Sequence, residues 1–86
     1  MRHREHSYRT LGRAIRELRR QRRLSQDELA RLSRMDRAYV GAIERGERRP
    51  TYGKVLDLAD ALSVAPGELV ARATAPRSDD AASAQP

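Results

Sequence analysis

The stretch LSQDELARLSRMDRAYVGAIERGERRP, residues 24–50, decides the fold of this 86-residue chain. It holds two short amphipathic segments that are separated by only a few residues. Ser25 precedes the first segment and Glu28 follows three residues later, which is the pattern of a capping box at a helix start. Asp36 stands before the second segment as a candidate cap, and Gly46 follows it as a left-handed terminator. The stretch therefore predicts two helices joined by a tight turn.

The apolar pattern of the same stretch predicts that the two helices cross. Ala30 is small where the helix of residues 37–45 would cross the helix of residues 26–33, and the branched Val40 would pack against it. The buried side is completed by Leu29, Leu32, Met35 and Ile43. These positions predict a helix-turn-helix unit over residues 26–45.

Outward from this unit, the chain predicts three more helices. Residues 8–23 carry apolar side chains at helical spacing, at Leu11, Ala14, Ile15 and Leu18. Thr51 would cap a fourth helix, whose inward side chains are Val55, Leu58, Ala59 and Leu62. Pro66 fits the first position of a short fifth helix that carries Leu69 and Val70. The predicted fold is all-α, with five helices in one domain over residues 8–73.

Two terminal segments fall outside this domain. Residues 1–7 are expected to be a flexible basic arm, and residues 74–86, which lack apolar periodicity, a disordered tail. His3 and His6 are three residues apart, but without another histidine or a cysteine they are a poor metal site, and we expect none.

Composition favours a polyanionic partner. The net charge is +6, and residues 1–50 hold 15 arginines against seven acids, a balance of +8, whereas the remainder comes to −2. The arginines near the end of the first helix are interpreted as a solvated face. The absence of cysteine excludes disulfides, thiolate zinc sites and thiol nucleophiles. No apolar run reaches the roughly 20 residues of a membrane span, so we expect a soluble, cytoplasmic protein without cofactor or small-molecule ligand.

The chain resembles the Cro/repressor (XRE) family of phage-repressor-like regulators. The resemblance lies in Leu24-Ser25-Gln26, Leu29-Ala30 and Ile43-Glu44-Arg45-Gly46, followed by Arg49-Pro50, and covers about residues 8–71. Within it, residues 36–50 look similar to the small controller proteins of restriction-modification systems, which are dimeric regulators. The resemblance implies a compact five-helix domain that binds double-stranded DNA.

The resemblance also implies roles for individual residues. Arg37, Ala38 and Ala42 match positions that face base edges in the major groove, and Arg37 could bond guanine bidentately. Contacts with the DNA backbone are implied at Gln26, Tyr39, Arg45, Arg48, Arg49, Thr51 and Lys54, and we add Tyr52 as an amphipathic residue at the domain edge. Glu44 is implied to form a structural ion pair with Arg19, which removes it from the site.

Two departures from the family pattern stand out. Arg34 occupies a turn position that is usually glycine because the backbone tends to be left-handed there, so the turn would be strained by about 1 kcal/mol or distorted. The second departure is that the reading face carries two alanines, Ala38 and Ala42. Specificity is therefore expected to depend on Arg37 and on DNA shape.

The apolar C-terminal end of the domain suggests a dimer. Val64, Leu69 and Val70 exceed what a short terminal helix needs for its own burial, and the family often dimerises through this end. The alternative is that all three side chains close the core. A two-fold dimer would place two reading helices about 34 Å apart, which matches half-sites one helical turn apart.

The leading functional hypothesis is a transcription regulator that binds an inverted repeat as a homodimer and controls its own promoter. Activation and repression both fit, and Glu47 or Asp27 could contact RNA polymerase. The alternative is an antitoxin that binds a toxin and autoregulates its operon, although the tail carries no large apolar anchor. An enzyme is not expected, since the sequence has no cysteine, no mid-chain histidine and no glycine-rich phosphate loop.

Overall fold

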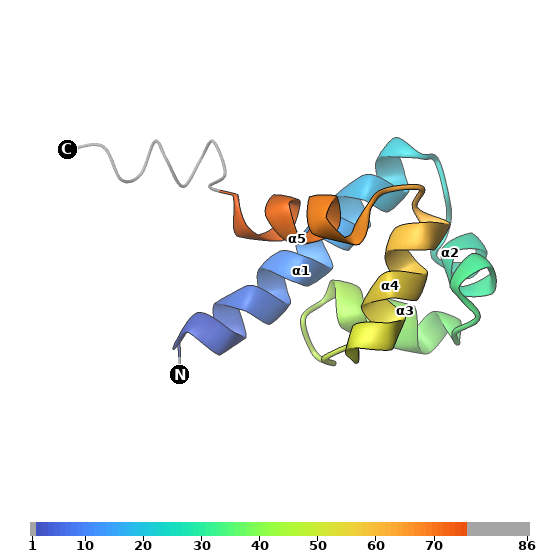
Figure 1. Cartoon of the computed structure of the whole chain (residues 1–86). Helices are drawn as coiled ribbons and strands as arrows, with labels where there is room; N and C mark the ends of the chain where they lie inside the picture. The colour runs from blue at the N-terminus through green and yellow to red at the C-terminus, as the bar shows by residue number, and fades with distance from the viewer. Residues whose placement is uncertain (1, 76–86) are drawn as a thin grey trace.

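The computed structural model describes residues 2–75, with side chains from Tyr8 onward. This part of the chain has five helices and no strand (Figure 1). They are α1 (Arg2–Gln21), α2 (Gln26–Ser33), α3 (Arg37–Glu44), α4 (Tyr52–Ala61) and α5 (Pro66–Thr74). The all-α fold class and the helix-turn-helix unit are as predicted.

The helix ends differ from the prediction at the N-terminus. α1 begins at Arg2, so the segment expected as a flexible arm continues the first helix from that residue. Residues 2–7 contain neither glycine nor proline, so nothing in the sequence stops the helix there. The predicted tail of residues 74–86 begins at the last residue of α5, and from residue 76 it lies outside the described residues.

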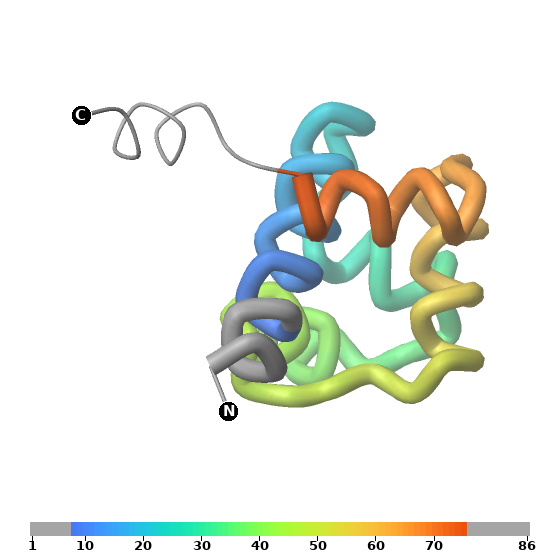
Figure 2. Tube along the Cα trace, turned by 60° about the vertical axis from the view of Figure 1, so that its left-hand side comes forward, coloured from blue at the N-terminus to red at the C-terminus, as the bar shows by residue number. Residues whose placement is uncertain are grey.

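The five helices enclose one core. α1 packs along α5 and also against α3, while α2 contacts both α3 and α4 (Figures 1 and 2). Every helix contributes at least one fully buried aliphatic side chain, and Leu62 adds one directly after α4. The fully buried aliphatic residues are Ile15, Leu18, Leu29, Val40, Ile43, Leu58, Leu62 and Leu69. Burial of such a side chain stabilises the fold by roughly 1.5–3 kcal/mol, so these positions hold the helix-turn-helix unit against α1 and α5.

The prediction of one core residue on α2, Leu32, is wrong. Leu32 is 58% exposed, whereas Leu29, Ala30 and Ser33 are buried. At 100° per residue these three lie within one narrow face of α2, and Leu32 falls beyond its edge. The buried Ser33 hydroxyl donates to the carbonyl oxygen of Leu29 at 2.6 Å, so the polar group in the core is satisfied.

α1 and α3 approach closely at Gly12. A Cβ atom there would collide with the carbonyl oxygen of Ile43 and lie 2.7 Å from that of Glu44. Gly12 is therefore the residue that lets α3 lie directly against α1. The sequence pattern gave no sign of this contact, because it joins residues far apart in the chain.

Candidate nucleic-acid interface

The turn between α2 and α3 has the left-handed geometry expected at this point of the helix-turn-helix unit. Arg34 has φ 59° and ψ 46°. The N–H of Met35 donates to the carbonyl oxygen of Ala30 at 2.8 Å, which closes the end of α2 as a terminal glycine would. The turn is thus not distorted by the arginine, and the strain of about 1 kcal/mol stays in the backbone.

The two helices of the unit begin differently. At α2 the Ser25 hydroxyl accepts from the N–H of Glu28 at 3.0 Å, and the Glu28 carboxylate accepts from the N–H of Ser25 at 2.8 Å. The predicted capping box is therefore confirmed, and the Ser25 backbone N–H holds the pKa of Glu28 below its ordinary value, with a smaller effect of the Ser25 side chain. Asp36 occupies the cap position of α3, but its side chain makes no capping hydrogen bond.

The end of α3 directs the chain into a basic loop. Gly46 has φ 76°, and the N–H of Glu47 donates to the carbonyl oxygen of Ala42 at 2.9 Å, so the predicted left-handed terminator is present. Thr51 then caps α4 by accepting from the N–H of Lys54 at 3.3 Å. These two turns place the loop and the start of α4 beside α3.

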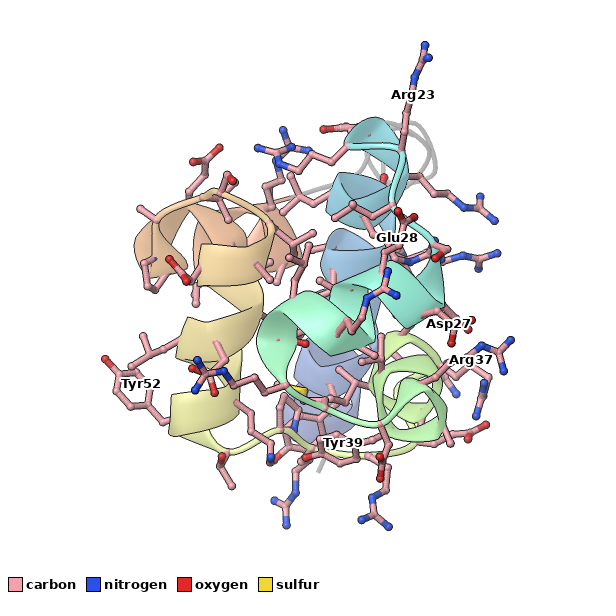
Figure 3. All side chains as sticks on the ribbon, turned by 90° about the vertical axis from the view of Figure 1, so that its right-hand side faces the viewer. Arg23, Asp27, Glu28, Arg37, Tyr39 and Tyr52 are labelled. Atoms are coloured by element: carbon pink, nitrogen blue, oxygen red, sulfur yellow. The ribbon has the colours of Figure 1, made fainter. Side chains whose placement is uncertain are left out.

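The outer face of α3 carries the three residues predicted to face bases. Arg37 and Ala38 are exposed, and Ala42 is half-buried. The Arg37 Nε lies 3.5 Å from Oδ1 of Asp27 on α2, and the two side chains are 65% and 71% exposed. Figure 3 shows both side chains at the same edge of the molecule. Arg37, the candidate for reading bases, is therefore accessible, and the ion pair that it forms with Asp27 is exposed to solvent.

A groove, here called the reading groove, runs between the end of α2, α3 and the start of α4. Its lining combines small apolar side chains with cations, from Ala30, Arg31, Arg34, Met35, Asp36, Ala38, Tyr39, Ala42, Arg48 and Lys54. Four of these residues are basic and one is acidic. A hollow of this charge on the exposed side of α3 suits a polyanion.

Arg48 and Lys54, two of the residues predicted to contact the DNA backbone, both lie near the aromatic ring of Tyr39. The Arg48 guanidinium lies 5.6 Å from the centroid of Tyr39, and the Lys54 ammonium lies 5.3 Å from it. The negative π surface of the ring attracts each cation and holds it near Tyr39. Tyr39, Arg48 and Lys54 therefore form a pre-assembled cationic cluster in the reading groove.

Arg49 and Arg45 point to other partners. Arg49 donates to the Tyr8 hydroxyl at 2.8 Å and lies 5.2 Å from that ring's centroid, and the hydrogen bond raises the pKa of Arg49. Arg45 lies 3.1 Å from Glu47, whose hydrogen bond raises the pKa of Arg45. Both arginines remain exposed, so each keeps surface for an anion.

Tyr52 is 78% exposed near the start of α4, at a different edge of the molecule from Arg37 (Figure 3). It lies outside the lining of the reading groove. The structure therefore brings Tyr39, Arg48 and Lys54 together but leaves Tyr52 apart from that cluster.

Behind the groove, Glu44 joins three helices. Its carboxylate accepts from Arg19 Nε at 2.7 Å and Arg19 Nη2 at 3.1 Å, so the expected ion pair is present and bidentate. It also accepts from the amide of Gln26 at 3.0 Å, while Arg19 donates to the carbonyl oxygen of Leu24 at 2.9 Å. Among the described residues every buried side-chain polar atom has a partner. The network fixes the start of α2 against α3.

Gly41 lies on α3 beside this network. A Cβ atom at that position would lie 3.1 Å from Arg45 Nη1, at the flexible end of that side chain, and 3.6 Å from the side-chain oxygen of Gln26, which is an ordinary van der Waals contact. The bond between Gln26 and Glu44 therefore does not depend on a glycine at this position. Gln26, predicted to contact phosphate, is held by a protein partner through its amide nitrogen.

Sequence reasoning missed three residues around this face. Tyr8 was not assigned to the site, yet it accepts a hydrogen bond from Arg49. Arg31 and Arg34 line the reading groove but were not assigned to it. A signal was present for Arg34, because it stands at a turn position where the family usually has glycine.

The chain matches a known family of helix-turn-helix proteins. Residues 15–69, more than half of the chain, match the helix-turn-helix family HTH_3. The chain belongs to the XRE-type helix-turn-helix family. The match begins within α1 and ends in α5, so it includes the whole XRE-type reading unit.

Two relatives each match more than half of the chain. The control protein C.SmaI of Serratia marcescens is 41% identical over 49 residues, which is 57% of this chain and 58% of that protein. The uncharacterized HTH-type transcriptional regulator y4dJ of Sinorhizobium fredii (strain NBRC 101917 / NGR234) is 42% identical over 53 residues, or 62% and 69% of the two chains.

Two solved structures resemble this XRE-type fold. The restriction-modification controller protein C.AhdI from Aeromonas hydrophila superposes with a TM-score of 0.71 at 47% identity, over 72% of this chain and 94% of that chain. The clp gene regulator ClgR from C. glutamicum gives a TM-score of 0.76 at 25% identity, over 78% and 86%. None of these four proteins is described as an enzyme or as an antitoxin. The predicted similarity to controller proteins is confirmed.

The XRE-type core corrects two of the predicted dimer contacts. Leu69 is fully buried and Val64 is 9% exposed, so both pack in the core of the single chain. They close the space between α4, α5 and α1, as the alternative interpretation held. Of the three residues only Val70, 49% exposed, lies open on the surface.

The described residues hold neither a metal-ligand cluster nor a membrane span. No group of three or more His, Cys, Asp or Glu side chains comes together there, and the side chains of His3 and His6 lie outside that part of the chain. No helix within residues 2–75 combines the length and the hydropathy that a bilayer crossing needs.

Proposed function

We propose that this XRE-type protein binds an inverted-repeat operator as a homodimer and regulates transcription from its own promoter. The names of two relatives, a control protein and a restriction-modification controller protein, support regulation as the role. The observation that carries the proposal is the reading groove, where an exposed helix face lies beside a cluster of cations.

In this proposal α3 enters the major groove and reads bases through its first residues. Arg37 donates two hydrogen bonds to the O6 and N7 atoms of a guanine. Ala38 and Ala42 are too short to hydrogen bond and can only contact thymine methyl groups. Since this leaves few direct base contacts, the remaining specificity comes from DNA shape and deformability.

The flanking residues hold the duplex by its backbone. Tyr39, Arg48 and Lys54 bind one phosphate region, and Gln26 binds from the start of α2. Further contacts with the duplex backbone, away from that cluster, are proposed for Arg45, Arg49, Thr51 and Tyr52. Helix N-termini favour phosphate because their free N–H groups carry partial positive charge. These contacts set the register of α3 and add affinity without sequence preference.

Dimerisation would supply the second reading helix. We place the contact at the exposed face of α5, around Val70, because Val64 and Leu69 are used in the core. A two-fold axis there relates two identical surfaces. The expected distance between the reading helices is about 34 Å, one turn of B-DNA.

The test is a selection of bound duplexes from a random DNA pool at about 150 mM salt, where weak non-specific binding is suppressed. The proposal predicts enrichment of an inverted repeat whose half-sites lie about one helical turn apart. Enrichment of a single half-site would contradict the dimer. No enrichment would contradict sequence-specific regulation altogether.

A further inference from the structure

Two arginines have nearly the same strained backbone. Arg23 follows α1 with φ 57°, and Arg34 follows α2 with φ 59°. In both places the next N–H closes the helix end, from Leu24 to Arg19 at 3.0 Å and from Met35 to Ala30 at 2.8 Å. Such a turn suits glycine, because an L side chain crowds the backbone in the left-handed region. Each position therefore carries an arginine at a cost to the fold.

Their surroundings differ. Arg34 lines the reading groove together with Ala38 and Ala42, the residues predicted to face bases. Arg23 lies at the tip of the loop between α1 and α2 and points away from the labelled Tyr39 and Arg37 (Figure 3). Arg23 is also absent from the groove lining. Only one of the two strained arginines faces the candidate interface.

The reading groove has cations on two sides. Arg48 and Lys54 lie on the side of the α3–α4 loop and α4, where Tyr39 holds them. Arg31 and Arg34 lie on the side of α2. The Arg34 side chain has no ion pair or side-chain hydrogen bond with any residue of the described part of the chain. Its five guanidinium donors are therefore open to an anion.

We propose that Arg34 binds a DNA phosphate from the α2 side of the reading groove, opposite the cluster of Tyr39, Arg48 and Lys54. A strand seated in the groove is then held from both sides. This inference rests on the proposed function, because the phosphate belongs to the bound duplex. It also gives the strained turn a use, since glycine would relieve the strain but remove the contact.

The experiment compares Arg34→Gly with Arg23→Gly as its matched control. Each variant removes one positive charge and replaces an arginine whose backbone is in the left-handed region with glycine. Both are expected to melt at the same temperature as the unaltered protein or up to about 5 °C higher, because glycine relieves the strain. That readout shows that both variants are folded before binding is compared.

Binding then separates the two arginines. At about 150 mM salt, Arg34→Gly is expected to bind every duplex about tenfold more weakly, and Arg23→Gly less than about twofold. The slope of log K against log salt should fall by about 0.9 for Arg34→Gly, the value of one lost phosphate contact, and stay unchanged for Arg23→Gly. Arg34→Lys keeps the charge and should restore the slope.

Equal losses for Arg23→Gly and Arg34→Gly, or an unchanged salt slope for Arg34→Gly, would overturn the inference. The contact between Arg34 and a phosphate does not depend on the base sequence of the duplex. It can therefore also be measured on a duplex without the operator, at a salt concentration below about 150 mM, where non-specific binding is stronger. A protein that selects no operator but loses one salt-slope unit with Arg34→Gly would contradict the proposed regulator and support the contact. An enriched operator together with an unchanged salt slope for Arg34→Gly would support the proposed regulator and contradict the Arg34 contact.

Discussion

The two ends of α3 carry the same chemistry in opposite surroundings. At its start Arg37 faces Asp27 across 3.5 Å, and the side chains are 65% and 71% exposed. At its end Glu44 meets Arg19 at 2.7 Å, and those side chains are 2% and 11% exposed. Both pairs join an arginine and a carboxylate from two helices, so burial is the main difference between them.

The difference separates a structural contact from an exchangeable one. Around Glu44 the low dielectric makes the pair strong and makes either partner costly to leave alone. Around Arg37 water screens the pair, so the arginine can leave Asp27 for another partner at small cost. α3 is thus fixed to the rest of the fold at its end, while the side chain at its start is free to exchange partners.

Glu44→Ala is expected to have the largest effect. It removes the acceptor of Arg19 and Gln26 and leaves a largely buried guanidinium unpaired, which should lower the free energy of unfolding by about 3–5 kcal/mol. Urea denaturation followed by circular dichroism measures this. A loss below about 1 kcal/mol would show that the buried end of α3 is not anchored by this pair.

Gly12→Ala tests the same anchored end through packing. A Cβ at Gly12 would collide with the backbone of Ile43, so α1 and α3 must separate, at an expected cost of about 3 kcal/mol. Gly67→Ala is the control, since nothing lies within 4 Å of a Cβ there, and it should stabilise α5 by about 0.5–1 kcal/mol. Similar melting temperatures for both variants would contradict the close approach.

Asp27→Asn should change stability by less than about 0.5 kcal/mol, because the pair that it breaks is exposed. Glu47→Gln is matched to it, since it changes the net charge equally and breaks the exposed pair with Arg45. Thermal unfolding of both variants should coincide with that of the unaltered protein. A loss of about 2 kcal/mol in Asp27→Asn alone would make the start of α3 structural too.

The smallest expected effect is a pH dependence at the start of α2. The pKa of Glu28 lies below its ordinary value of 4.5, so its contribution to stability is present above pH 4.5 and is lost as the pH falls through the lowered pKa. Glu28→Gln keeps an acceptor but cannot titrate. Its melting temperature should therefore fall less between about pH 5 and pH 3 than that of the unaltered protein. An identical fall in the two proteins would contradict this role of Glu28.

The sequence predicted those features that depend on neighbouring residues. The capping box at Ser25, the terminator Gly46 and the first position of α5 at Pro66 are all local, and each is present. The crossing of α2 and α3 was predicted because the small Ala30 stands a fixed distance from Val40. The pair of Arg19 and Glu44 followed from the family resemblance rather than from spacing.

Features that depend on distant residues were missed. Tyr8 meets Arg49 across 41 positions of sequence, and no local pattern links them. Leu69 and Val64 were assigned to a dimer because sequence cannot say whether an apolar side chain faces its own core or a partner. Arg31 and Arg34 lie on the same side of the reading groove, which only the three-dimensional arrangement of α2, α3 and α4 creates.

In the proposed function the exposed start of α3 reads bases, while the residues around it only hold the duplex. The most direct measurement is the affinity of Arg37→Ala and Arg48→Ala for a panel of single-base variants of the selected operator. Arg37→Ala is expected to lose about 1–3 kcal/mol of binding free energy and to relax the preference at one base pair per half-site, whereas Arg48→Ala should weaken binding equally on all variants. Equal losses across the panel for both variants would contradict this division of roles.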